Sequence, residues 1–203
     1  MDPIRERPVL DVSGLPTMMF GKANTTWLAN LLYMMIEGTM FALVVASYFY
    51  LRTRSSSWPP GNLPPTLGWG ITSGAIFLMS LVPARYAQRV APSGDRTKIR
   101  WGLLALAGVA VIAMVVRGFE LANLNCRWNE NAYASTVWAL LGLHTGHLIT
   151  EFIETVVILC VSFTDKMEGT RLADVGINSD YWYFVVVTAI LSDFVIYGTT
   201  RFL

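Results

Sequence analysis

The sequence predicts an all-α polytopic membrane protein, a helical bundle with five transmembrane helices. Hydrophobic residues make up 54% of the 203 residues and charged residues only 14%, and the apolar residues are gathered into blocks. About 20 predominantly apolar residues are needed to cross a bilayer as a helix. Five blocks reach that length, and they cover residues 27–51, 67–87, 101–122, 132–163 and 181–200.

The runs and their connections predict one bundle over residues 27–203. The first run is too long and too far from the start for a cleaved signal peptide, so we expect it in the mature protein. The fourth run is longer than a span requires and should tilt or project from the bilayer. Turn-forming residues mark connections at 58–65, 91–95, 125–131 and 167–180. Residues 1–26 are expected to lie along the cytoplasmic surface as a separate N-terminal segment.

The distribution of basic residues predicts the orientation. When the five runs are threaded alternately through the bilayer and Arg117 within the third run is left out, ten Lys and Arg residues fall on the side of the N-terminus and four on the other side. Short cytoplasmic loops carry an excess of such residues. The N-terminus should therefore be cytoplasmic and the C-terminus outside, and we expect a bacterial plasma membrane.

Composition also excludes several classes of function. A net charge of +1 gives no basic face for nucleic acid. Cys126 lies in the connection before the fourth run and Cys160 near the far end of that run, too far apart for a disulfide with each other, and neither has a CxxC partner. Motifs for a nucleophilic serine or for a phosphate-binding loop are absent from the sequence. No catalytic residue and no active site are therefore expected.

The fourth run contains both histidines of the chain and two glutamates, where polar groups are costly. At about 100° per residue, these four side chains fall within roughly 80° of one helix face. They are His144, His147, Glu151 and Glu154. The sequence therefore predicts a polar stripe along this helix.

Other polar groups are expected at membrane depth in the neighbouring runs. Glu37 lies near the middle of the first run, where a carboxylate facing lipid would be most costly, so it should face protein. Arg117 and Glu120 are three residues apart and can pair with each other near the interface. Asp193 lies in the last run.

Two interpretations of the stripe compete on chemical grounds. His144 and His147, with Glu151 or Glu154 and completed by Glu37, resemble the inward-facing ligands of di-metal helical bundles. The stripe is about 15 Å long, however, and only one helix supplies histidine, so a hydrogen-bonded seam between helices is favoured over a metal site. A buried polar seam is thus predicted, with a structural or proton-related role.

Several motifs, taken in order, resemble subunit III of the haem-copper oxidases. The resemblance runs from about residue 27 to the end of the chain. Its features are Glu37 before an aromatic-rich helix end, the WPP at 58–60, Glu120, the Tyr133-Ala-Ser135 segment, the Gly142-x-His144-x-x-His147 motif and the closing YWYFV at 181–185. Longer members of this family have seven helices, and this chain is similar to a divergent five-helix form that lacks the first two.

Four positions depart from the family pattern. Arg117 stands where the family has Gln, Glu151 where it has Gly, and Tyr183 and Val186 where its closing motif has His and Asp. These changes add charge to two helices and remove polar groups from the last one. They predict a divergent branch.

The resemblance implies an accessory subunit of a respiratory cytochrome c or quinol oxidase in aerobic electron transport. Haem and copper would belong to partner subunits I and II, with no cofactor in this chain. Bound phospholipid and support of proton uptake and stability of the catalytic subunit are also implied. Glu37 and His147 are expected to meet across the first and fourth helices, with His144 and Glu120 nearby. The alternatives are an accessory subunit of a nitric oxide reductase, or an independent membrane protein that uses the stripe for metal binding or proton movement.

Overall fold

A computed structural model describes residues 24–61 and 64–202, which form helices and connections without any strand. The long helices are α1 (Thr25–Thr53), α2 (Leu67–Val90), α3 (Arg96–Ala122), α4 (Ala132–Ser162) and α5 (Thr170–Asp193). Within these described residues, five helical segments are long and apolar enough to cross a membrane. The prediction of an all-α bundle with five transmembrane helices is confirmed, whereas the expected placement of residues 1–23 lies outside the described residues.

Short helical segments and side-chain caps complete the elements. A 3₁₀ turn, η2 (Ala91–Ser93), follows α2, and a π-helix, η3 (Phe194–Gly198), with α6 (Thr199–Phe202) extends α5. Side-chain oxygens of Asn24, Asp95 and Asn131 accept hydrogen bonds from the first turns of α1, α3 and α4. Because Asp95 caps α3, that helix starts within the basic connection, before the apolar run predicted from residue 101.

The start of α5 differs most from the sequence-based expectation. A connection was predicted over 167–180, but α5 already begins at Thr170, after Gly169 with φ of 58°. Leu172 and Val175 are three residues apart and pack into an apolar cluster with Ile99 and Ile158. The charged and small residues of this segment suggested a loop, but burial of its apolar face against the ends of α3 and α4 favours a helix.

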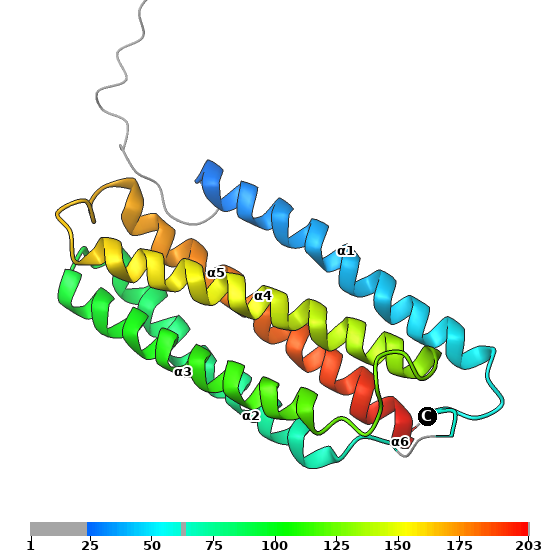
Figure 1. Cartoon of the computed structure of the whole chain (residues 1–203). Helices are drawn as coiled ribbons and strands as arrows, with labels where there is room; N and C mark the ends of the chain where they lie inside the picture. Colours follow the sequence, from blue (N-terminus) through cyan, green and yellow to red (C-terminus); the bar gives the residue numbers. More distant parts are fainter. Residues whose placement is uncertain (1–23, 62–63, 203) are drawn as a thin grey trace, which may run out of the picture.

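The five long helices differ in how deeply they are buried (Figure 1). α5 packs against α2, α4 and α1. In the span Thr170–Phe202, which α5 begins, 56% of the apolar 18-residue stretch is buried. α1 contacts only α4 and α5 extensively, and only 11% of its apolar 18-residue stretch is buried. The bundle therefore has a central helix near the C-terminus and a peripheral helix near the N-terminus.

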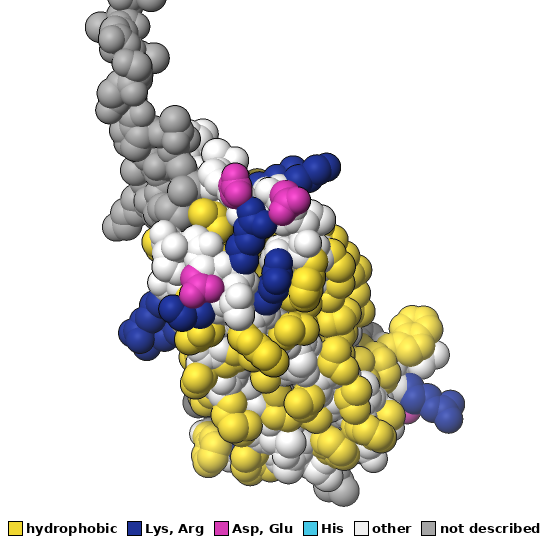
Figure 2. Space-filling view, turned by 90° about the vertical axis from the view of Figure 1, so that its left-hand side faces the viewer, with side chains coloured by type: hydrophobic (Ala, Val, Ile, Leu, Met, Phe, Trp, Pro, Cys, Tyr) yellow, Lys and Arg dark blue, Asp and Glu magenta, His cyan; other side chains and the backbone are white. Residues whose placement is uncertain are grey.

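Charged side chains gather at one end of the bundle, where α2 connects to α3 and α4 to α5. Figure 2 shows Lys, Arg, Asp and Glu side chains at this end, above a mostly hydrophobic face. Arg96 bridges the two connections by pairing with Asp165 at 3.2 Å and Glu168 at 2.6 Å. A charged end that adjoins an apolar flank is the surface expected where a bundle leaves a bilayer.

Candidate functional site

The two histidines of α4 point to different neighbours, although they are only three residues apart. His144 is fully buried and faces α3 and α5, whereas His147 faces α1 and is 8% exposed. The two histidines of the predicted stripe therefore belong to two different polar clusters, one on each side of α4. The outer cluster consists of Glu37, His147 and Tyr181, and the inner cluster consists of Arg117, Glu120, His144, Asp193 and Tyr197.

The outer cluster joins three helices through one carboxylate. The Glu37 Oε1 atom of α1 lies 3.2 Å from His147 Nε2 of α4. Its Oε2 atom accepts a hydrogen bond of 2.5 Å from the Tyr181 hydroxyl of α5. The rings of Phe41 and Phe184 pack around His147, at 5.2 and 6.3 Å between centroids. The structure thus brings Glu37 and His147 together between the first and fourth helices.

Hydrogen-bond chemistry places a proton between Glu37 and His147. The His147 Nδ1 atom lies 2.7 Å from the Leu143 carbonyl oxygen, which can only accept, so Nδ1 carries a hydrogen. The Nε2 atom then contacts a Glu37 oxygen, and one of these two atoms must carry a proton for the contact to be favourable. The pair is either imidazolium with carboxylate or imidazole with carboxylic acid, so it can hold one exchangeable proton.

An open groove borders the outer cluster. Its volume is about 320 Å³, and it is lined by Glu37 and His147 together with Tyr33, Gly142 and Gly146. Neither glycine has another atom within 4 Å of the position that a Cβ would take. The outer cluster can therefore be reached from the surface of the bundle.

The inner cluster is centred on an arginine that is completely buried. Arg117 Nη1 donates to Glu120 Oε2 at 2.8 Å and lies 3.8 Å from Asp193 Oδ1. The Tyr197 hydroxyl donates to the other Glu120 oxygen at 2.5 Å. The guanidinium also lies 5.6 Å from the centre of the Phe77 ring. The predicted pair of Arg117 and Glu120 is thus present, and both side chains are buried inside the bundle.

His144 completes the inner cluster as a neutral ring. Its Nε2 atom lies 3.0 Å from the Val185 carbonyl oxygen and must carry the hydrogen. The Nδ1 atom is then a free acceptor, 3.4 Å from Arg117 Nη2. Neither oxygen of Asp193 receives a hydrogen bond, although both are buried. The arginine therefore faces two carboxylates, of which Glu120 has the better partners.

Glu151 and Glu154 have different positions, contrary to the prediction that both are buried. Glu151 is 1% exposed, and its Oε1 atom accepts a hydrogen bond from Asn178 of α5, which also pairs with Thr155. Its Oε2 atom has no partner. Glu154 is exposed. The reason is helical geometry, because Glu154 is rotated by about 80° from His144, further than the other members of the stripe.

Three partners of the predicted residues were missed as site residues. They are Tyr181, Asn178 and Tyr197, all on α5 or its extension. Asn178 and Tyr181 are three residues apart, so they share a helix face, and this spacing is the signal that could have identified them. Tyr197 lies in the π-helix after α5, and the sequence does not predict that irregular turn.

The geometry does not favour the metal interpretation of the stripe. Across residues 24–61 and 64–202, no three His, Cys, Asp or Glu side chains are placed to hold a metal ion. Both cysteines are free, with Cys126 buried and Cys160 exposed. Burial and the nearby Glu130 carboxylate raise the pKa of the Cys126 thiol. A thiol with a raised pKa is a poor ligand and nucleophile at neutral pH.

Comparison with known proteins gives a consistent set of relatives, although no family model matches the chain. Cytochrome c oxidase subunit 3 of Thermostichus vulcanus is 25% identical over 179 residues, which cover 86% of this chain and 88% of the relative. Cytochrome c oxidase subunit 3 of Corynebacterium diphtheriae is 23% identical over 82% of this chain and 84% of its own length. Cytochrome bo(3) ubiquinol oxidase subunit 3 of Pseudomonas aeruginosa is 25% identical over 82% and 81%.

These similarities extend over most of the transmembrane region and agree with the five-helix architecture. The motif residues that suggested the resemblance lie in the two clusters, with Glu37 and His147 in the outer one and Glu120 and His144 in the inner one. The chain is therefore a multi-pass membrane protein that resembles subunit III of the haem-copper oxidases over most of its length.

Proposed function

We propose that this chain is an accessory, non-catalytic subunit of a respiratory haem-copper oxidase and assembles with subunits I and II. The observation that carries the proposal is the similarity over more than four-fifths of the chain to subunits 3 of both cytochrome c and quinol oxidases. Haem and copper belong to the partners in this proposal. The polar side chains of this subunit hold its own helices in place within the membrane.

Purification with a tag on this chain tests the assembly. The complex is extracted from native membranes in mild detergent, and a reduced-minus-oxidised optical spectrum is recorded. Haem bands are expected, and they should be absent when the chain is expressed alone. A stable native preparation without haem would overturn the proposal. Haem accompanied by nitric oxide reduction, rather than oxygen reduction, would instead assign the chain to a nitric oxide reductase.

We further propose that the outer cluster supports proton uptake by the catalytic subunit. Asp174, Asn178 and Tyr181 follow one face of α5, at the spacing i, i+4 and i+7. They run beside Glu151 and His147 of α4, from the charged end of the bundle toward Glu37. Glu151 interacts electrostatically with Glu37 and with Glu154. This succession of polar groups supports transfer of a proton between the charged end of the bundle and the Glu37–His147 pair.

Glu151→Gln tests the proton role, because it keeps the size of the side chain and removes the exchangeable proton. We expect the oxygen consumption of the intact complex to fall several-fold at alkaline pH, where protons are scarce, with unchanged haem content. Glu130→Gln, at the opposite end of the bundle, is the matched control. Equal rates for both variants and the parent complex would contradict the proton role and leave the seam as a structural feature. Proton or metal transport by the isolated chain would favour the independent alternative.

The orientation and the lipid contacts are part of the same proposal. The excess of basic residues supports a cytoplasmic N-terminus and an outside C-terminus in a bacterial plasma membrane. Alkaline phosphatase fused to the C-terminus should then be active in the cells, and an inactive but intact fusion would reverse the orientation. We also propose that the chain holds phospholipid at its surface.

A further inference from the structure

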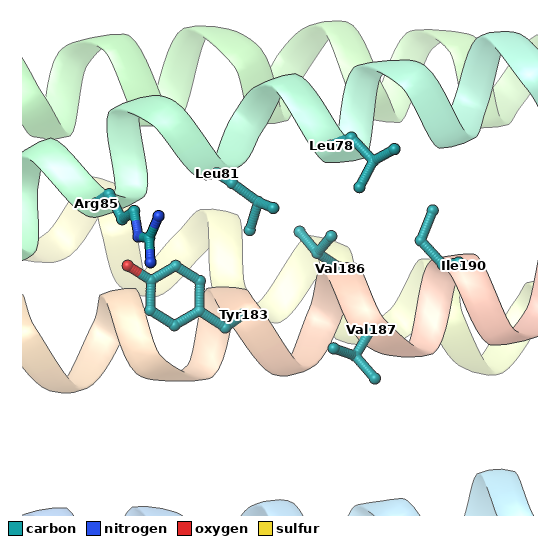
Figure 3. Close-up of a pocket in the computed structure, with 7 residues that line it drawn as sticks. All are labelled: Leu78, Leu81, Arg85, Tyr183, Val186, Val187 and Ile190. Atoms are coloured by element: carbon teal, nitrogen blue, oxygen red, sulfur yellow. The ribbon is translucent and has the colours of Figure 1, made fainter.

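Two cavities lie along one seam between α2 and α5, and together they form a groove that we call the α2–α5 groove. The larger cavity, about 480 Å³, lies toward the charged end, where Arg85 and Val187 are in its lining (Figure 3). The smaller cavity, about 260 Å³, reaches Leu67 at the start of α2, and Ile190 lines both cavities. From Leu67 to Arg85, α2 rises about 27 Å, close to the roughly 30 Å of a hydrocarbon core. The groove thus follows almost a whole membrane span.

Exposed apolar side chains form a wall on each side of the α2–α5 groove. Its lining includes four that are more than half exposed: Ile71 and Leu78 of α2, and Val187 and Phe194 from α5 and its extension. The members of each pair are seven residues apart, about two helical turns, so each pair lies along one face of its helix. Rows of side chains with a groove between them are the surface into which the side chains of a third helix can pack.

Glycines keep the groove open at the end near the start of α2. Gly74 of α2 and Gly198 of η3 are in its lining, and neither has a side chain to fill it. Small residues are enriched where transmembrane helices pack, because they let backbones approach closely. They do not identify an interface alone, since Gly70 in the same lining accommodates the ring of Tyr197 within the chain. Whether lipid or protein covers the groove therefore depends on its charged groups.

A carboxyl group without a hydrogen bond lies in the wall of the groove. Asp193 is in the lining and 9% exposed, and neither of its oxygens has a hydrogen-bond partner. Arg117 lies 3.8 Å from it but donates to Glu120. Ionisable groups at membrane depth are costly beside lipid and almost always face protein or water. Glu37 also borders a groove, but both of its oxygens have partners within the chain. The α2–α5 groove is therefore suited to a cover of protein.

The charged end of the groove carries two arginines without an ion pair. Figure 3 shows Arg85 of α2 and Tyr183 of α5 pointing toward each other. Arg89 follows Arg85 by about one helical turn and also interacts electrostatically with Tyr183. Across the described part of the chain, neither arginine lies within ion-pair distance of a carboxylate. Asp180, which interacts with Tyr183, already accepts hydrogen bonds from two other side chains. This end is complementary to a carboxylate from outside the chain.

We propose that the α2–α5 groove docks a transmembrane helix of a haem-carrying partner subunit, with a carboxylate at one end of that helix paired with Arg85 and Arg89. The remainder of the helix is apolar and packs between the two walls. The length of the groove matches that of a helix of about 20 residues, which crosses a bilayer. Its presence would separate the wall at Asp193 from lipid. This inference rests on the proposed function, because it requires haem-carrying partners, and it adds the face of the chain that binds one of them.

A second copy of this chain fits the groove less well than a different subunit. Two copies with the same orientation in the membrane, related by a two-fold axis, would use the same surface on both sides. Arg85 and Arg89 would then face the same two arginines, and like charges repel. The unpaired charge at this end therefore favours a partner with an acidic side chain.

Photo-crosslinking in the intact complex tests the docking site. A photo-reactive phenylalanine analogue replaces Val187 in the groove or, as the matched control, Ile36 of α1, and both side chains are 64% exposed. The analogue at position 187 should crosslink to a transmembrane segment of a haem-carrying subunit, identified by mass spectrometry of the crosslinked peptides. The analogue at position 36 should not crosslink to that segment. The segment should carry Asp or Glu near the level of Arg85.

Two variants test the contacts themselves. Val187→Trp fills the groove and Arg85→Glu reverses the charge at its end, and both positions are exposed, so the melting temperature of the full chain alone should not change. In the complex, the haem recovered per tagged chain should fall several-fold for each variant. Ile36→Trp and Arg171→Glu, also at exposed positions, are the matched controls and should retain haem. Replacing the acidic residue of the crosslinked segment by Lys should restore haem to the Arg85→Glu complex.

The outcomes separate this site from the proposed function. Haem in the parent preparation reports on assembly, whichever face of the chain is used. If haem is present but the analogue at position 187 crosslinks only to lipid or to a second copy, the docking site is overturned and the proposed function stands. Haem recovery equal to that of the parent in both groove variants would also overturn the site. A stable native preparation without haem would overturn both proposals. A crosslink to a haem-carrying subunit, with haem lost in both groove variants and kept in both controls, would establish the site.

Discussion

The outer and inner clusters each contain a histidine of α4, a glutamate and a tyrosine, but the inner cluster adds an arginine and an aspartate, and the two differ in access. His147 and Glu37 border an open groove and share one proton between two helices. Arg117, Glu120 and His144 are fully enclosed, and there a charged guanidinium sits beside a neutral imidazole. The difference teaches that access to the surface and the presence of a buried cation, and not the histidine alone, distinguish the two clusters.

The enclosed cluster also joins more of the bundle. It links α3, α4 and the end of α5, where the Tyr197 ring packs directly on Gly70 of α2. A side chain at Gly70 would come within 2.5 Å of that ring. The outer cluster instead fastens α1, the least buried helix, to α4 and α5. Loss of the inner cluster should therefore affect the whole fold, and loss of the outer one should mainly release α1.

The largest effect is expected when the buried arginine is removed. Arg117→Ala leaves Glu120 and Asp193 without their cation inside the bundle, which costs about 3–5 kcal/mol when one partner of a buried pair is lost. We expect a large fall in the thermal melting temperature of the detergent-solubilised chain. Restoring the family's Gln as Arg117→Gln, together with Asp193→Asn, should recover part of the loss. A double variant as unstable as Arg117→Ala would contradict this account of the charges.

A smaller effect is expected for the carboxylate of the outer cluster. Glu37→Ala removes the acceptor of the Tyr181 hydroxyl and the partner of His147, and unsatisfied buried polar groups cost about 1–3 kcal/mol. The melting temperature and the amount of subunit retained in the complex should both fall. Glu37→Gln, which keeps an acceptor for Tyr181, is the control and should be milder. Unchanged melting and retention in Glu37→Ala would show that the cluster does not fasten α1.

Two tyrosines allow the clusters to be compared with the same chemical change. Tyr197→Phe and Tyr181→Phe each remove one hydroxyl that donates to a glutamate, at 2.5 Å in both cases. A hydrogen bond to a charged group contributes about 1.5–3 kcal/mol, and the loss is larger where water cannot replace the donor. Tyr197→Phe should therefore destabilise the chain more than Tyr181→Phe in chemical or thermal unfolding. A larger destabilisation by Tyr181→Phe than by Tyr197→Phe would contradict the idea that the two clusters differ in their access to water.

The sequence predicts the helices of this fold better than it predicts the site. Long apolar runs define spans because bilayer thickness fixes their length, but α5 begins in a segment whose apolar face is recognised only through its packing at Leu172 and Val175. Helical spacing places His144 and His147 near one stripe, yet a rotation of 60° is enough to direct them to different helices. Partners such as Tyr197 depend on the π-helix after Asp193, and this irregular turn has no signal in the sequence.

The smallest effect is expected for Glu154, the member of the stripe that the structure places at the surface. Glu154→Gln should change the free energy of unfolding by no more than about 0.5 kcal/mol, because substitutions at exposed positions away from a network are nearly neutral. Glu151→Ala, one turn away, removes the buried acceptor of Asn178 and should cost clearly more. Unfolding of both variants in the same detergent compares them directly. If Glu154→Gln were as destabilising as Glu151→Ala, Glu154 would have a buried partner in the assembled complex, and the stripe would continue into the interface with that partner.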